Sequence, residues 1–133
     1  MYILKPVASS CGRGIRVIGK KTHISKKIGY LASKYVSKPH LLRGYKYDLR
    51  LYVLVTSFEP LRVYLFEEGL VRLATQPYST KGTLGKRFVH LTNYSVNKKS
   101  EIYVKNTNGQ KVEEQKEQMP SKWDFKALKA EYE

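Results

Sequence analysis

The sequence predicts an α+β fold in which a central antiparallel sheet is flanked by helices. Its clearest strand covers residues 47–56, where β-favouring apolar and polar side chains alternate. Shorter β-rich segments separated by turn residues precede and follow this strand, and a helix-capping pattern stands near the carboxyl end. Together these three observations favour a sheet with helices packed beside it.

The amino-terminal part is expected to contain three short strands, at residues 2–4, 15–18 and 30–36. Pro6 ends the first strand and Pro39 follows the third, because proline restricts the residue before it and lacks a donor for a sheet. Residues 7–14 are small, polar and glycine-containing, which predicts a mobile loop. The polar and basic residues 22–27 are expected to form a second loop.

The central strand is expected to continue into a three-stranded meander. Glu59-Pro60 is a turn signal, and residues 61–66 are the predicted antiparallel partner. Glu67-Glu68-Gly69 is a second turn, which leads into residues 70–75 as the third strand. Residues 76–87 contain two glycines and are predicted to form a loop, whereas the asparagine-rich residues 89–99 give no clear signal.

The carboxyl-terminal part is expected to hold a flexible insertion and a helix. Residues 101–119 are hydrophilic and charged, which predicts the insertion. Ser121-Lys122-Trp123-Asp124 matches a capping box that would open the helix. The chain starts inside a predicted strand and stops inside this predicted helix, so residues 1–133 are expected to be the central part of a larger domain.

Composition restricts the class of protein and the kind of partner. The 133 residues are 41% hydrophobic and 27% charged, which fits one small globular unit with its own core. The formal net charge of +14 favours acidic partners, among them nucleotides, nucleic acids, anionic membranes and acidic proteins. Cys11 is the single cysteine, which excludes an internal disulfide. No apolar segment is long enough to predict membrane insertion.

One face of the central strand is a candidate site. Alternate side chains share a face, so Lys46, Asp48 and Arg50 would point the same way. The opposite face is apolar and is expected to be buried; it consists of Leu49, Leu51, Val53 and Val55. Two cations can hold phosphates while a carboxylate accepts from ribose hydroxyls. Alternatively, the charges pair with one another at the surface, which contributes about 0–1 kcal/mol. The strand alone leaves both interpretations open.

Three further segments carry groups that suit a nucleotide or a small polar substrate. Lys5 precedes the glycine-containing loop, whose amides could approach phosphate oxygens, although a plain hairpin is also consistent with it. Residues 33–36 could present main-chain groups to a base, or form an ordinary core strand. Residues 90–99 concentrate hydroxyl, amide and ammonium groups, which could hold a zwitterion or an acyl-phosphate, or form an exposed turn.

Several other kinds of site are not supported. His23, His40 and His90 have no metal-ligand spacing, and each is interpreted as a surface or structural histidine. No Ser-His-Asp or Cys-His arrangement is present. A basic β-rich nucleic-acid-binding domain would explain the charge and the 11 tyrosines, but tyrosine is also common in strands.

Taken together, the motifs resemble the tubulin tyrosine ligase-like family of the ATP-grasp superfamily. The matching stretches include Ile3-Leu4-Lys5-Pro6, Gly12-Arg13-Gly14-Ile15, Lys46-Tyr47-Asp48-Leu49-Arg50 and Glu68-Gly69-Leu70-Val71-Arg72. The most specific is His90-Leu91-Thr92-Asn93-Tyr94-Ser95-Val96-Asn97-Lys98, whose ending is most similar to the polyglutamylase branch. The resemblance implies an ATP-grasp-like fold, of which this chain would be an incomplete fragment of the catalytic domain.

The resemblance also implies which residues bind ATP. Lys5 would contact the phosphates beneath a closing loop that contains Cys11, Gly12, Arg13 and Gly14. The adenine would meet the main chain of a hinge formed by Lys34, Tyr35 and Val36. Lys46 and Asp48 would hold adenine and ribose, which assigns Asp48 to the nucleotide and not to a surface ion pair. Thr92 and Asn93 would line the junction between nucleotide and substrate.

Catalytic and substrate roles follow from the same resemblance. Arg50 and Arg72 would act on the transferred phosphoryl group, and Arg72 would also bind the carboxylate of free glutamate together with Tyr94, Ser95 and Lys122. Mg²⁺ is the implied second cofactor, but its carboxylate ligands are expected downstream of this chain, so the isolated chain is expected to be inactive. Cys11 stands where arginine is usual and Ser33 where glutamine is usual, which would weaken ATP binding.

The function implied is glutamate addition to glutamate side chains of tubulin tails through an acyl-phosphate. The expected partners are tubulin or microtubules and free L-glutamate, with no nucleic acid and no membrane insertion, and the expected location is the cytoplasmic microtubule cytoskeleton, including the cilium or basal body. The basic charge would steer the protein to acidic tails. The alternatives are an inactive microtubule-binding fragment and a nucleic-acid-binding β domain.

Overall fold

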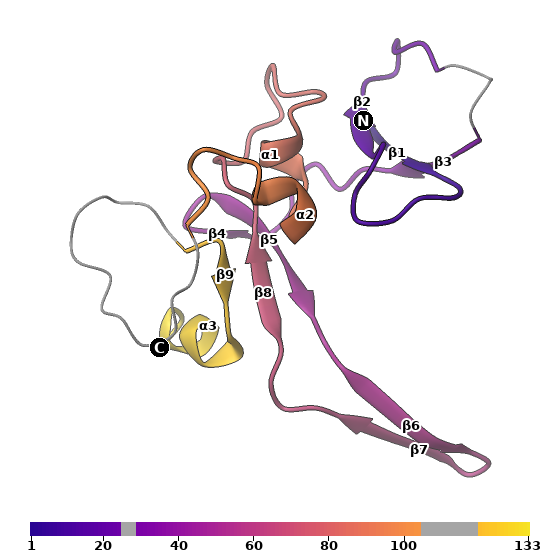
Figure 1. The fold of residues 1–133 in the computed structure, drawn as a ribbon, viewed down its shortest axis with the longest axis vertical. Coiled ribbons are helices and arrows are strands. Elements are labelled where there is room, and N and C mark those ends of the chain that lie inside the picture. Colours follow the sequence, from indigo (N-terminus) through magenta and orange to yellow (C-terminus); the bar gives the residue numbers. More distant parts are fainter. Residues whose placement is uncertain (25–28, 105–119) are drawn as a thin grey trace.

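Antiparallel sheets with a few short helices make up the fold in a computed structural model, which describes residues 1–24, 29–104 and 120–133. The described strands form a three-stranded sheet in the order β2-β1-β3, a four-stranded sheet in the order β4-β5-β8-β9, and a two-stranded sheet of β6 and β7. Figure 1 shows the first sheet on one side, the second at the centre and the third as a projecting arm. The predicted mixture of antiparallel strands and helices is confirmed.

The amino-terminal sheet forms around β1 (Tyr2–Pro6), which lies between β2 (Arg16–Ile18) and β3 (Tyr30–Lys34). Leu4 is fully buried at the middle of β1, where it pairs with Arg16 on one side and Ala32 on the other. The three strands predicted here are confirmed, and β1 runs two residues further than predicted. Of the predicted loop at residues 22–27, residues 22–24 belong to no strand or helix, and residues 25–27 lie outside the described residues.

The central sheet holds the main apolar core of the described residues. It comprises β4 (Leu41–Leu42), β5 (Tyr45–Arg50), β8 (Leu70–Leu73) and β9 (Lys122–Trp123). A two-residue turn joins β4 to β5, and both Arg43 and Gly44 have positive φ, as a type I′ hairpin turn requires. The core of the sheet consists of Leu42, Val71, Leu73 and Trp123.

The predicted single strand at residues 47–56 is wrong, because the chain leaves the extended ladder at residues 51–52. It divides into β5 and β6 (Val53–Phe58), and β6 pairs with β7 (Leu61–Leu65) as predicted. The predicted meander is also wrong, because β8 pairs with β5 and not with β7. β5–β6 and β7–β8 are thus the two sides of one long hairpin that reverses at residues 59–60.

The apolar face predicted for the central strand is not buried. Leu49 and Leu51 are 44% and 48% exposed, and Val53 and Val55 remain 55% and 40% exposed. For Val53 and Val55 the reason is that no described segment covers the arm formed by β6 and β7, which extends away from the rest of the molecule (Figure 1). Alternation therefore identified a strand without indicating whether another layer packs on it.

Three short helices complete the described structure: α1 (Arg87–His90), α2 (Tyr94–Asn97) and α3 (Phe125–Ala130). The predicted capping box is wrong in its position, because Asp124 caps α3 by accepting from the amide of Ala127 at 2.7 Å. Trp123 belongs to β9 instead of the helix, and α3 ends at Ala130 before the chain stops. Most of the predicted insertion at 101–119 lies outside the described residues.

Candidate functional site

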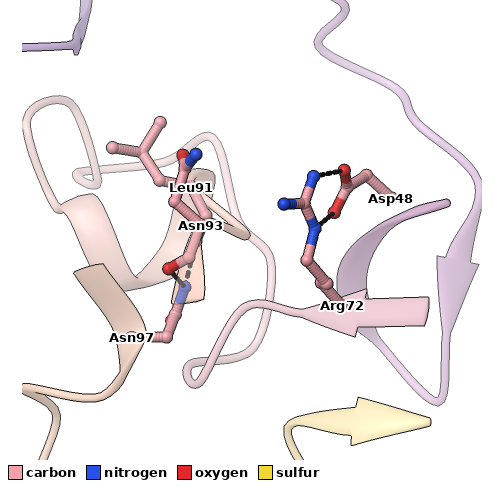
Figure 2. A network of polar contacts seen from close by, with 5 residues as sticks. All are labelled: Asp48, Arg72, Leu91, Asn93 and Asn97. Carbon is pink, nitrogen blue, oxygen red and sulfur yellow. Dashed lines mark hydrogen bonds and ion pairs between the residues drawn. The ribbon is translucent and has the colours of Figure 1, made fainter. Parts of the chain in front are cut away.

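Asp48 and Arg72 face each other across the central sheet. They are direct partners in the antiparallel register of β5 and β8. Arg72 Nε donates to Asp48 Oδ1 at 3.0 Å, and Arg72 Nη2 donates to Asp48 Oδ2, which gives a two-point ion pair. The hydrogen bond to the carboxylate raises the pKa of Arg72, so this cation stays charged. Figure 2 shows the pair beside the segment that carries Asn93.

This ion pair corrects one expectation for Asp48. The resemblance assigns Asp48 to the nucleotide and not to an ion pair, yet its carboxylate pairs with Arg72 in this structure. The pair was missed because residues 48 and 72 are far apart in the sequence and only the β5–β8 register brings them opposite each other. The ribose contact itself stays a prediction. It would require Asp48 to keep a free lone pair or to exchange partners.

Lys46 lies half-buried beside Tyr35 and His90. Its Nζ donates to the Tyr35 hydroxyl at 3.1 Å and to the His90 carbonyl at 3.0 Å, and it lies 4.7 Å from the centre of the Tyr35 ring. Burial lowers the pKa of Lys46, while the nearby Asp48 carboxylate acts in the opposite direction. Lys46 is therefore held by neutral oxygens and an aromatic face.

His90 is a structural histidine, consistent with the interpretation from the sequence, and it is only 2% exposed. Its Nε2 lies 3.0 Å from the Thr83 carbonyl oxygen, which can only accept, so Nε2 carries the proton. The neutral ring then leaves Nδ1 to accept from the Tyr35 hydroxyl at 2.9 Å. Burial lowers the pKa of His90, in keeping with this neutral form. The chain of contacts from Thr83 through His90 and Tyr35 ends on the Lys46 ammonium.

The glycine loop is fastened to the helical segment by two of its carbonyls. Ser95 Oγ donates to the Cys11 carbonyl at 2.6 Å, and Arg87 Nη2 donates to the Gly12 carbonyl at 2.8 Å. Cys11 and Gly12 have φ values of 57° and 74°, so the loop turns in the left-handed region. A Cβ on Gly12 would lie 3.0 Å from Asn93 Oδ1, so glycine permits this close approach.

Beside the loop lies a cavity of about 550 Å³ that brings together several predicted nucleotide-binding residues. It is lined by Lys5, Cys11, Gly12, Arg13 and Asn93, together with Ser9 and Ser10. Lysine at a strand end, arginine and two serines form a chemical environment that suits phosphate. The residues present therefore fit the triphosphate end of a nucleotide.

A second cavity, of about 710 Å³, collects the predicted catalytic and substrate-binding residues. Arg50, Arg72 and Lys122 give it positive charge, and Lys122 pairs with Arg72 in the register of β8 and β9. Thr92 and Tyr94 line it from the other side, together with Tyr52, Tyr103 and Ser121. Three cations beside several hydroxyls can hold a carboxylate and orient a small polar molecule.

Asn97 supports the segment that separates these cavities. It is 1% exposed, its Nδ2 donates to the Leu91 and Asn93 carbonyls at 2.7 and 3.1 Å, and its Oδ1 accepts from the Thr75 amide at 3.0 Å. Figure 2 shows the Asn97 amide directed at Leu91 and Asn93. These hydrogen bonds therefore hold the segment with Thr92 and Asn93 against the residues that follow β8.

Not all predicted residues meet in one place. Lys34 and Val36 are exposed at the end of β3 and beyond it, and the Tyr35 amide already donates to the Met1 carbonyl at 3.2 Å. The hinge contacts with adenine stay predictions, and the Tyr35 amide is not available for them here. Gly14 packs against Pro6. A Cβ at position 14 would lie 2.7 Å from Pro6 Cγ, which is too close for any residue other than glycine.

The described residues do not fit a magnesium site by themselves. No group of three or more His, Cys, Asp or Glu side chains within residues 1–24, 29–104 and 120–133 is arranged to hold a metal ion. The carboxylate that lines the second cavity is Asp124, which caps α3, and Asp48 is paired with Arg72. We therefore assign no metal-binding role to these residues. Within the described part, no helix has the length and apolar character to cross a membrane.

Sequence reasoning missed three residues that shape the site: Arg87, Asn97 and Tyr103. Asn97 belongs to residues 90–99, whose polar groups suggest a ligand site. Its burial explains the difference, because a buried amide must satisfy its own hydrogen bonds.

Comparison with known proteins agrees with the family resemblance of the sequence motifs. The model of the tubulin-tyrosine ligase family matches residues 1–133. Tubulin monoglutamylase TTLL4 of Homo sapiens is 45% identical over 129 residues, which is 96% of this chain and 11% of that protein. Tubulin polyglutamylase TTLL5 of Homo sapiens is 52% identical over 104 residues, or 77% of this chain and 8% of that protein.

A third relative, tubulin polyglutamylase TTLL7 of Mus musculus, is 37% identical over 131 residues, which is 97% of this chain and 14% of that protein. The chain thus spans between 8% and 14% of the length of these curated relatives.

Proposed function

Because the chain belongs to the tubulin-tyrosine ligase family, we propose that it forms part of an ATP-dependent ligase that adds glutamate to glutamate side chains in tubulin tails. The relatives support this choice, since each is named a tubulin monoglutamylase or polyglutamylase. An ATP-grasp-like catalytic domain is part of the same proposal and is consistent with the antiparallel sheets. The expected location is the cytoplasmic microtubule cytoskeleton, including the cilium or basal body.

The observation that carries the proposal is that one short segment, residues 92–94, lines two neighbouring cavities. Asn93 lines the cavity of the glycine loop, and its neighbours Thr92 and Tyr94 line the cavity of Arg50 and Arg72. A ligase that joins a phosphoryl donor to an amino acid needs such adjacent compartments, because the two reactants must approach each other. The segment 92–94 would therefore lie at the junction between them.

In this proposal ATP supplies the phosphoryl group that activates the acceptor γ-carboxylate as an acyl-phosphate. The amine of free glutamate then attacks the acyl carbon, which forms the isopeptide bond and releases phosphate. Lys5 and the amides around Gly12 would hold the phosphates. Arg50 and Arg72 would hold the carboxylate of free glutamate and balance the charge that develops on the transferred group.

Lys46 and Lys122 would have supporting roles. Lys46 would contact the nucleotide base from its position on Tyr35, and Lys122 would add charge to the glutamate cavity. Because the described residues do not fit Mg²⁺, no step here is assigned to a metal ligand of this chain. Catalysis by these residues would be mainly positioning and charge stabilisation.

The test uses the full-length protein with ATP, microtubules and, in parallel, labelled glutamate, glycine or tyrosine. We expect incorporation of glutamate alone, and we expect Arg72→Gln to reduce it by at least about 100-fold, as loss of a transition-state charge contact does. Arg62→Gln, on the exposed arm, is the matched control and should retain activity. Transfer of glycine or tyrosine in place of glutamate would refute the proposed substrate.

A second experiment tests nucleotide binding in the 133-residue chain itself. Trypsin can cleave after Arg13 in the exposed glycine loop, and bound ATP should slow this cleavage if its phosphates occupy the Lys5 cavity. Lys5→Gln should abolish the protection. Protection by an oligonucleotide and not by ATP would favour the nucleic-acid-binding alternative, whereas microtubule binding without any effect of ATP would favour an inactive microtubule-binding fragment.

A further inference from the structure

Gly69 is buried at the place where the long hairpin changes from the projecting arm to the central sheet (Figure 1). It directly precedes β8, and the next residue, Leu70, pairs with Arg50 as the register pair of β5 and β8 nearest the arm. Glu67 and Glu68 before it are exposed, so burial of the chain begins at Gly69. Burial of a residue without a side chain means that other groups lie close to its backbone.

The groups that cover Gly69 are the main chain of Arg50 and the ring of Phe125. A Cβ at position 69 would lie 2.6 Å from the Arg50 carbonyl oxygen and 2.5 Å from Phe125 Cζ. Both distances are shorter than a Cβ atom tolerates, so no side chain fits between the two groups. Gly69 is not among the glycines with positive φ, so the requirement for glycine here is steric and not conformational.

The Phe125 ring cannot easily move away from Gly69. Phe125 begins α3 and packs against the buried core of the central sheet. Before the helix, the register of β8 and β9 places Trp123 opposite Val71. After the helix, Glu131 accepts from Arg43 Nε at 2.7 Å. Because α3 is attached to the central sheet at both ends, a side chain at position 69 would displace the end of β5 more readily than the helix.

A displacement at the end of β5 affects Arg50 in particular. β5 ends at Arg50, whose side chain lines the cavity that also contains Arg72. Arg72 lies two register positions further along the sheet and is held by its ion pair with Asp48. The ion pairs among the described residues do not include Arg50. The position of the Arg50 guanidinium therefore depends on where its main chain leaves the sheet.

We propose that Gly69 is a positioning residue, which leaves room for the Phe125 ring against the Arg50 main chain and so sets Arg50 at the site of the free amino acid. This inference rests on the proposed function, in which Arg50 binds the carboxylate of glutamate. Gly69 does not itself line that cavity. A shift of about 1 Å in a substrate-binding group can cost about 100-fold in rate, even when its cause lies outside the site.

The test compares the steady-state kinetics of the full-length protein with those of its Gly69→Ala variant, with free glutamate and ATP varied in turn. We expect the KM for glutamate to rise at least about tenfold, because Arg50 is displaced. The KM for ATP should change less than about twofold, because neither Gly69 nor Phe125 lines the cavity of Lys5.

Gly19→Ala is the matched control. A Cβ at position 19 would lie 3.4 Å from Leu84 Cδ1, and Gly19 is not among the glycines with positive φ. Both KM values should stay within about twofold of those of the parent protein.

Phe125→Leu is a second variant, which keeps the inference testable if Gly69→Ala does not fold. It retains an apolar side chain against the core but removes the ring atoms beside Gly69, so the end of β5 loses its support. We expect the KM for glutamate to rise about threefold, with the KM for ATP again unchanged.

Two results would overturn the inference. They are an unchanged KM for glutamate in a variant that circular dichroism shows to be folded, and an equal rise of both KM values, which indicates a general loss of structure. Glutamate transfer by the parent protein decides the proposed function separately. If the parent transfers none, trypsin cleavage after Arg50 in the 133-residue chain tests the position of Arg50. Gly69→Ala should accelerate this cleavage at least about threefold relative to Gly19→Ala, and equal rates would refute the inference.

Discussion

His90 connects the scaffold to the site at the level of a single residue. Its two ring nitrogens contact Thr83 and Tyr35, and the Tyr35 hydroxyl in turn accepts from Lys46. Because a buried neutral imidazole has one donor and one acceptor, this order of contacts allows one tautomer. His90 is therefore a positioning residue for Lys46 and needs no contact with a substrate.

We predict that the free energy of unfolding decreases as the pH falls below about 6.5, the ordinary pKa of histidine. Burial lowers the pKa of His90 in the folded chain, so the unfolded chain takes up the proton first and is favoured at lower pH. His90→Gln should cost about 1–3 kcal/mol at pH 7.5 and reduce this pH dependence. Urea unfolding at pH 7.5 and 5.5 measures both effects.

His23→Gln is the control for this prediction, because His23 is exposed. It should leave both the stability at pH 7.5 and the dependence on pH close to those of the parent chain. If His90→Gln keeps the full pH dependence, the buried imidazole is not its source.

Asn97 gives a second prediction at this scale. Asn97→Ala removes the donors to Leu91 and Asn93 and the acceptor for Thr75; the bonds to Leu91 and Thr75 are buried, and the bond to Asn93 is partly buried. We expect a loss of about 2–4 kcal/mol, the cost of leaving buried polar groups without partners. Thermal or urea unfolding measures it.

Asn97→Asp distinguishes the contribution of the Nδ2 donors from that of the Oδ1 acceptor. It retains an oxygen for Thr75 but places a carboxylate against the Leu91 carbonyl, so at neutral pH it should be at least as destabilising as Asn97→Ala. A loss below about 0.5 kcal/mol for either variant would show that the segment 91–97 is positioned by other contacts.

At the scale of elements, the arm of β6 and β7 differs from the two larger sheets. Apolar side chains are exposed on both of its faces, with Leu54 62% exposed on one side and Val53 55% on the other. The amino-terminal and central sheets each bury part of their apolar residues, as Leu4 and Val71 illustrate. A two-stranded ribbon without a packed layer is only marginally stable by itself.

We therefore predict that backbone amides of residues 53–65 exchange with solvent much faster than those of β1 and β8. Local opening of the arm breaks few buried apolar contacts, so its free energy should be close to zero, whereas opening of β1 or β8 should require most of the global free energy of unfolding. Hydrogen exchange of the 133-residue chain, followed by mass spectrometry, measures both regions in one experiment. Equal protection of the arm and of β1 would contradict the prediction.

At the scale of the whole molecule, charge is the dominant property. Lys and Arg total 25 against 11 Asp and Glu, and two cavities in the described part of the chain are each lined by three or more cations. A surplus of this size attracts acidic partners over distances near the Debye length, which shortens as salt increases.

We predict that binding of the 133-residue chain to microtubules weakens at least about tenfold between 50 and 200 mM KCl, because screening reduces the long-range attraction. Microtubules whose acidic tails have been removed by subtilisin should bind more weakly at both salt concentrations. Co-sedimentation measures both comparisons. Binding that does not change with salt or with removal of the tails would show that attraction between charges is not the basis of the interaction.

The sequence by itself determined several strands, the carboxyl-terminal helix and the family. Short β-rich segments bounded by turn residues identified strands β1, β2, β3 and β7, and the motif from His90 to Lys98 identified the family that the comparison then showed. These signals are local, since each depends on residues that are adjacent or nearly so in the chain. The glycine loop beside Lys5 was predicted correctly for the same reason.

Only the tertiary structure decided which segments meet. The pairing of β8 with β5, the ion pair of Asp48 with Arg72, and the inward orientation of His90 and Asn97 all join residues that a local pattern cannot relate. Alternation likewise could not show that Leu49 and Val53 remain exposed, because exposure depends on whether another layer covers the strand. The physical reason is that long-range contacts compete for the same polar groups, and the choice among them is made by the folded chain as a whole.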